Sequence, residues 1–183
     1  EPLTNFDNVV SALRLMLDDN AYGLSRRRVT VSTAGVVPGM DRLREECPVA
    51  LAVSLHAPND ALRDQLVPIN RKYPLVDVVR AARHYAEVTK RRVTYEYILI
   101  DRVNDGEEQA RELVSLLRGQ LASVNLIPIN PVAERHLLRP SAARIDWSEH
   151  YLTAHHINVT VRREMGTDIQ AACGQLRNKH LDG

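Results

Sequence analysis

The sequence predicts an α/β fold, in which parallel strands form a sheet with helices on its outer side, as in a partial (β/α) barrel. Short β-branched or apolar runs alternate with segments whose apolar residues recur at helical spacing, which is typical of parallel sheets. The 183 residues suit a single domain, 1–183, but fall short of the roughly 250 residues of a complete eight-stranded barrel. No glycine-rich phosphate loop follows a predicted strand, which disfavours a dinucleotide-binding sheet. An open doubly wound sheet stays an alternative.

Apolar spacing and end signals predict the elements of the first half. Val10, Leu13 and Leu17 form one side of a helix, and a valine–threonine–valine run indicates a strand after it. The run 49–55 is apolar throughout, as in a strand covered on both faces, and Asn59 is a typical N-cap. The expected elements are a helix at 7–18, a strand at 28–32, a helix at 40–46, a strand at 49–55 and a short helix that ends at 66.

The second half continues this alternation. A stripe that includes Leu75, Val78 and Val79 predicts a long helix, and a second stripe with Leu113 and Leu117 predicts another. Runs rich in β-branched residues predict the strands between them. The expected elements are a helix at 75–88, a strand at 93–100, a helix that begins at 105–106, a strand at 124–129, a helix at about 148–155 and a strand at 157–162.

Polar side chains follow three of the predicted strands where each strand ends. Ser32 ends the first strand, Ser54 and His56 end the second, and Asn130 follows a later one. The loops after parallel strands converge at one edge of the sheet, where ligands bind, so we expect these groups to face one pocket. Each residue alone would be read as a cap or a satisfied buried polar group. Their repetition favours a site for a polar ligand with several functional groups.

Three further residues carry groups that bind or react in proteins. Glu1 would lie on the same rim if a strand came before it, and its carboxylate would then suit an ammonium group; an exposed chain end is the alternative. Cys173 lies among small residues on a turn where another molecule can approach the sulfur, as a nucleophile requires. Residue chemistry alone favours a small, buried, unreactive side chain for Cys173, and more strongly for Cys47.

Composition and charge exclude several classes. The net charge of +1 gives no overall preference for nucleic acid, and 4% aromatic content disfavours binding by extended base stacking. Two distant cysteines and short apolar runs indicate neither a disulfide framework nor a membrane span, which suits a reducing cytoplasm. We also expect a monomer. Each basic cluster taken alone is expected to be a solvated helix end or strand start. Together they would form a phosphate-binding surface if they converged on one face. These clusters are residues 26–28, 71–72, 90–92, 162–163, and the pair 177 and 179.

Seven sequence blocks follow one another from residue 1 to about residue 176. They are EPLTNFDNV, RRVTVSTAGVVP, LAVSLHAPND, LVPIN, YEYILIDRVND, NLIPINP and GTDIQAACGQL. In this order they resemble the radical S-adenosylmethionine (SAM) adenine-2 RNA methyltransferases of the RlmN type. The resemblance covers nearly the whole chain and is weakest at 133–138. It implies a partial barrel of the radical SAM type, truncated at its N-terminus.

The resemblance assigns roles to the residues already singled out. It implies that six rim residues bind SAM, with the glutamate at the SAM amino group, and that Cys173 becomes transiently methylated. The six are Glu1, Ser32, Ser54, Leu55, His56 and Asn130. In the family, the cysteine takes a methyl group from one SAM, and a radical made from a second SAM at a [4Fe–4S] cluster drives transfer of the carbon to adenine carbon 2. The implied partners are 23S ribosomal RNA, transfer RNA and a reducing electron donor protein.

The sequence departs from the family pattern in its cysteines. The CxxxCxxC motif that binds the cluster, the resolving cysteine and a catalytic glutamate are absent, and Cys47 matches none of them. We therefore expect this chain to be the C-terminal part of a longer enzyme and to be inactive alone. Two alternatives stay open: a carbon-8 adenine methyltransferase that confers antibiotic resistance, and a non-catalytic RNA-binding module. Pro2 after Glu1 favours the carbon-2 enzymes.

Overall fold

The protein is a parallel sheet whose strand order equals the order of the strands along the chain. The computed structural model describes residues 1–130 and 137–162, and these contain five strands. They are β1 (Thr30–Thr33), β2 (Ala50–Ser54), β3 (Val93–Leu99), β4 (Ala122–Pro128) and β5 (Asn158–Val161), paired in the order β1-β2-β3-β4-β5. Every crossover thus moves in the same direction, and the right-handed rule places the connecting helices on one face. A doubly wound sheet needs the order to reverse, so that alternative is wrong and the partial barrel is confirmed.

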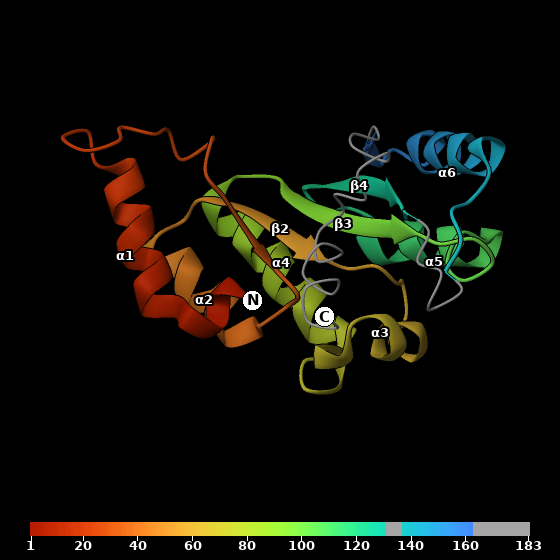
Figure 1. Ribbon diagram of the computed structural model, residues 1–183, viewed down its shortest axis with the longest axis horizontal. Coiled ribbons are helices and arrows are strands. Elements are labelled where there is room, and N and C mark those ends of the chain that lie inside the picture. Colours follow the sequence, from red (N-terminus) through yellow and green to blue (C-terminus); the bar gives the residue numbers. More distant parts are fainter. Residues whose placement is uncertain (131–136, 163–183) are drawn as a thin grey trace, which may run out of the picture.

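Helices connect the strands and follow one another along the sheet. In Figure 1, α1 and α2 lie at one end of the molecule and α5 and α6 at the other. The described helices are α1 (Phe6–Leu17), α2 (Val37–Glu46), α3 (Asp60–Leu66), α4 (Leu75–Thr89), α5 (Glu107–Leu117) and α6 (Ala142–Ala154), with 3-10 turns η1 (Pro2–Asn5) and η2 (Pro68–Arg71). Among these residues, no helix is long and apolar enough to span a membrane.

The core lies between the helices and one face of the sheet. β3 alternates along its length, with Val93, Tyr95, Tyr97 and Leu99 buried and the residues between them partly exposed. The buried residues of α4 belong to the same apolar cluster. β2 is buried at its three central residues, which confirms that its middle is covered on both faces. The alternation in β3 leaves a second face of the sheet for other groups.

Two helices begin earlier than the sequence predicts. α2 begins at Val37 rather than at 40, because Pro38 is tolerated in a first helical turn. The expectation that the last long helix begins at 148 is wrong, since α6 begins at Ala142 and Ser141 caps it by accepting from the Arg144 N–H at 3.2 Å. Only three residues of α6 are buried, so its apolar stripe is too thin to mark the start.

Candidate functional site

The sheet face that turns away from the buried core residues carries a row of polar side chains. Ser54 of β2, Glu96 of β3, Asn125 of β4 and Thr160 of β5 are cross-strand neighbours. The Asn125 amide donates to Glu96 Oε2 at 2.8 Å, and the Thr160 hydroxyl donates to Asn125 Oδ1 at 3.1 Å. We did not expect this row from the sequence. Its signal is one charged or amide residue, Glu96 or Asn125, in the middle of an otherwise largely apolar strand and on the face opposite the buried residues.

Ser32 and Ser54 both lie on this face, near the C-terminal ends of their strands. Ser32 is exposed and pairs with Ala52, so it lies one row from Ser54 on the neighbouring strand. Asn130, which is partly exposed, follows β4 directly. The structure therefore brings these three residues to one edge of the sheet, which we call the rim.

Glu1 is attached to the end of β1. Its Oε1 accepts from the Thr33 hydroxyl at 3.0 Å and from the Leu3 N–H at 3.0 Å, and its Oε2 accepts from the Ala34 N–H at 2.6 Å. These hydrogen bonds hold the carboxylate on the rim, although Glu1 itself is exposed. A carboxylate oxygen can accept about two hydrogen bonds, so Oε2 keeps capacity for a cation.

His56 is held in one protonation state and one tautomer. Burial, followed by the charge of Arg63, lowers the pKa of His56 from 6.5 to about 4, so the ring is neutral at pH 7. Its Nδ1 accepts from the Ile98 N–H at 3.2 Å, which places the proton on Nε2. A hydrogen bond from the ring to the Glu96 backbone offsets part of this lowering of the pKa. His56 also has a φ of +61°, a left-handed conformation that is often found at functional sites.

Arg63, which the sequence analysis missed, joins the ends of β1 and β2. Its side chain is fully buried. Nη2 donates to the carbonyls of Ala34 at 2.7 Å and Ser54 at 3.0 Å, Nε donates to the Leu55 carbonyl at 3.1 Å, and Nη1 donates to Asn70 Oδ1 at 2.7 Å. All three guanidinium nitrogens are therefore engaged, and this fixes the rim backbone.

Asn104, which the sequence analysis also missed, fixes the backbone at the end of β3. It is 2% exposed, and its amide donates to the His56 carbonyl at 2.8 Å and to the Ile98 carbonyl at 2.5 Å. Its Oδ1 accepts from the Ile100 N–H at 2.8 Å. Asn104 therefore links the turn that carries His56 to the neighbouring strand.

The remaining predicted residues differ in what they offer the rim. Leu55 is fully buried, and its N–H donates to the Glu96 carbonyl, so it supports the rim without presenting its side chain there. Cys173 lies outside the described residues. Cys47 is 2% exposed, which confirms the expected buried thiol.

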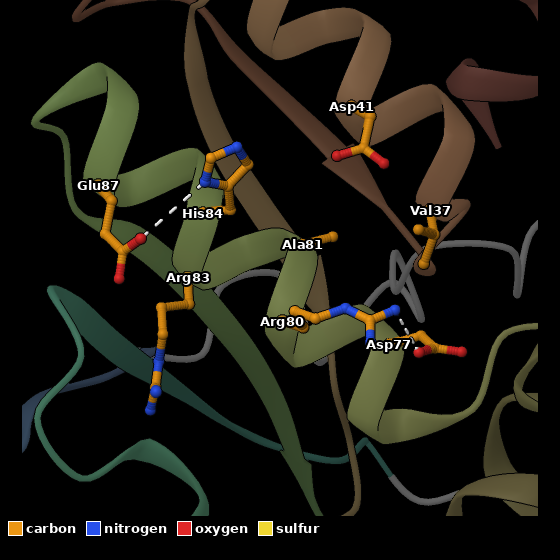
Figure 2. Close-up of a pocket in the computed structure, with 8 residues that line it drawn as sticks. All are labelled: Val37, Asp41, Asp77, Arg80, Ala81, Arg83, His84 and Glu87. Atoms are coloured by element: carbon orange, nitrogen blue, oxygen red, sulfur yellow. Dashed lines mark hydrogen bonds and ion pairs between the residues drawn. The ribbon is translucent and has the colours of Figure 1, made fainter.

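A cavity of about 380 Å³ lies between α2 and α4 (Figure 2). Carboxylates and guanidinium groups both line it, and Arg80 donates to Asp77 at 2.6 Å. None of the predicted site residues lines it. We therefore assign the candidate site to the rim and the polar row rather than to this cavity.

Comparison with known proteins places this chain in a family. The model of the radical SAM superfamily matches residues 1–114. A curated Symbiobacterium thermophilum protein described as a probable dual-specificity RNA methyltransferase RlmN is 56% identical over 181 residues, which cover 98% of this chain and 49% of that protein.

Solved structures agree with this assignment. The crystal structure of a radical SAM methyltransferase from Sphaerobacter thermophilus matches with a TM-score of 0.90 and 50% identity, over 96% of this chain and 52% of that chain. A domain of a pyruvate-formate lyase-activating enzyme from Bacteroides vulgatus matches with a TM-score of 0.66 at 17% identity, over 89% of this chain and 94% of that chain, and shows a shared fold. The chain thus spans about half the length of the two methyltransferases that it matches. Because the superfamily model matches more than half of the chain, including most of the rim, this chain belongs to the radical SAM superfamily.

Proposed function

We propose that this chain is the SAM-binding part of a methyltransferase that methylates carbon 2 of adenine in 23S ribosomal RNA and transfer RNA, with Cys173 as the methyl carrier. The observation that carries the proposal is the 56% identity, over 98% of the chain, to a protein described as a probable dual-specificity RNA methyltransferase. The rim supports it independently, because its groups are those that a zwitterionic nucleoside ligand needs.

The residues of the rim fit SAM, which joins an amino acid to a nucleoside through a sulfonium. The free capacity of Glu1 Oε2 suits the ammonium group of the ligand, and neutral His56 offers one Nε2–H donor. The hydroxyls of Ser32 and Ser54 and the amide of Asn130 add groups that both donate and accept. When bound, SAM supplies an electrophilic methyl group and a source of radical chemistry.

The residues of this chain do not fit the [4Fe–4S] cluster that radical SAM chemistry uses. Cysteine thiolates hold such clusters, and the sequence has two cysteines, of which Cys47 is in the core. The described residues contain no group of three or more side chains that could hold a metal ion. We propose that the cluster ligands, and the surface for the electron donor, lie outside this sequence.

Cys173 is proposed to overcome a mismatch between the two reactants. Adenine carbon 2 lies between two ring nitrogens and is electron-poor, so it does not attack an electrophilic methyl group. The Cys173 thiolate would do so: its sulfur would form a bond to the methyl carbon while the bond from that carbon to the sulfonium breaks, which releases a neutral thioether. The carbon is then held on this chain, ready for transfer to the base.

Nucleoside mass spectrometry tests the proposal. Cells that lack their own adenine-2 methylation and express the full-length gene product are expected to gain 2-methyladenosine in 23S ribosomal RNA and transfer RNA. Cys173→Ala abolishes the product, whereas Cys47→Ala keeps it, since that thiol lies in the core. The appearance of 8-methyladenosine would overturn the carbon-2 assignment. RNA binding without any methylated adenosine would overturn the enzyme in favour of a binding module.

A further inference from the structure

Two of the basic clusters meet at the N-terminal edge of the sheet, at the opposite end of the strands from the rim. Residues 26–28 precede β1, and residues 90–92 precede β3. Arg91 Nη1 donates to the Arg26 carbonyl at 3.1 Å, and Arg26 Nη1 donates to the Pro48 carbonyl, just before β2, at 3.4 Å. The two clusters therefore share one surface, which we call the basic edge and define as residues 26–28 and 90–92.

The basic edge carries charge that no carboxylate of the described residues neutralises. An open groove of about 800 Å³ at this edge is lined by Arg27, Ala50, Thr89, Lys90, Arg91 and Arg92, so it has four cations and no acid. Within the part of the chain that the structure describes, none of the six cations of the basic edge forms an ion pair. Like charges held together in this way raise the local concentration of anions.

A further groove without a carboxylate lies along the same edge of the sheet. This groove, of about 590 Å³, lies at the starts of β4 and β5, and its charged or titratable residues are Arg118, His155 and His156. Its residue Ala122 pairs with Val93, which directly follows the basic edge. The cavity of Figure 2 differs, because acids and bases there neutralise one another.

We propose that the basic edge binds the phosphate backbone of the RNA substrate, away from the base that reacts at the rim. The inference rests on the proposed function. Five of the six cations are arginines, whose planar guanidinium groups match phosphate oxygens in a bidentate way. The groove has no aromatic side chain on which bases would stack, and no large apolar side chain of the kind that forms the centre of a protein interface. These features favour backbone contacts with RNA over single-stranded bases or an acidic protein.

The distance between the two edges is compatible with one RNA molecule reaching both. β3 has 7 residues. At about 3.3 Å per residue, the strand separates the rim from the basic edge by about 20 Å. Folded ribosomal and transfer RNAs are larger than this span, so a base can enter the rim while the backbone of a neighbouring segment lies on the basic edge.

The test measures RNA binding by the full-length protein at several salt concentrations. Arg27→Gln, Lys90→Gln and Arg92→Gln are combined, because these side chains make no hydrogen bond within the described residues. Each phosphate contact contributes about 0.7 to 0.9 to the slope of log affinity against log salt, so the triple variant is expected to lower that slope by about 2 to 3. The ratio of the RNA affinity of the unsubstituted protein to that of the triple variant is then expected to fall about 20- to 40-fold between 50 and 200 mM salt. Arg14→Gln, Arg80→Gln and Arg111→Gln form a control with the same change in charge.

The outcomes separate this inference from the proposed function. A parent-like slope and affinity in the triple variant would overturn the inference, as would an equal loss in the control. Loss of binding to polyglutamate with unchanged binding to RNA would also overturn it, and would assign the edge to an acidic protein. Because binding is measured without turnover, a parent protein that makes no 2-methyladenosine contradicts the proposed function alone. Loss of RNA affinity with unchanged SAM affinity supports the inference.

Discussion

At the scale of the residue, His56 shows what a sequence reveals about a site and what it does not. Its position after an apolar strand predicts that it lies at the rim. Its lowered pKa depends first on burial and then on the charge of Arg63, and its tautomer depends on the Ile98 N–H. None of these can be inferred from the residues next to it. The same holds for Glu1, whose partners Thr33 and Ala34 lie more than thirty positions away.

The low pKa of His56 predicts how stability depends on pH. The unfolded imidazole takes up a proton near pH 6.5, whereas the folded one does so only near pH 4. The free energy of unfolding is therefore unaffected by His56 above pH 6.5 and falls as the pH decreases through this window, by as much as about 3 kcal/mol. Urea unfolding at pH 7.5, 6.0 and 5.0 measures the fall.

His56→Asn provides the control for this prediction. Asparagine tolerates a positive φ and keeps an acceptor near the Ile98 N–H, but it does not titrate. Carboxylates contribute equally in both proteins, so the difference between the two pH profiles isolates the imidazole. Identical profiles from pH 7.5 to 5.0 would show that His56 is not held neutral by burial.

At the scale of the element, helices and strands with strong local signals follow the sequence closely. The cap of α3 is an example, since Asn59 Oδ1 accepts from the Leu62 N–H at 3.0 Å as expected. Arg63, one residue further along the same helix, could not be predicted, because a charged residue in a short polar helix usually faces water. Its burial follows from carbonyls of two strands and from Asn70, which only the folded chain brings together.

Arg63 is expected to be the most sensitive single position for the joint between β1 and β2. Arg63→Met removes the donor of the Ala34, Ser54 and Leu55 carbonyls in a buried place. Breaking such a buried charged network lowers the free energy of unfolding by roughly 3–5 kcal/mol. Arg63→Lys keeps the charge but cannot reach both strands at once, so its loss is intermediate.

Urea unfolding measures this loss as a shift of the midpoint, with the slope of unfolding free energy against urea concentration unchanged. Arg111→Met on the exposed side of α5 is the matched control and changes stability by less than about 0.5 kcal/mol. A loss below about 1 kcal/mol for Arg63→Met would mean that water satisfies the freed carbonyls, and that the strand ends do not depend on this side chain.

At the scale of the whole molecule, the strand order decides where ligands can bind. Alternating helices and strands predict a parallel sheet, but the direction of each crossover is not visible in that pattern, which is why a doubly wound sheet stayed an alternative. With all crossovers in one direction, one sheet face packs on helices and the other carries the row from Ser54 to Thr160. The two ends of the strands then become two separate surfaces, the rim and the basic edge.

Hydrogen exchange of the full-length protein distinguishes these two surfaces. S-adenosylhomocysteine, which keeps the amino acid and nucleoside of SAM, is expected to slow exchange in peptides that cover 30–36 and 54–60. RNA is expected to slow exchange in peptides that cover 24–29 and 88–93, since a ligand at 100 times its Kd stabilises the state it binds by about 2.7 kcal/mol. Peptides within 78–84, which lie by the cavity of Figure 2, serve as the internal control because neither ligand reaches them. Protection of the rim peptides by both ligands, with none at 24–29 and 88–93, would show that RNA approaches from one end of the strands alone, and the separation of the two surfaces would then have no functional role.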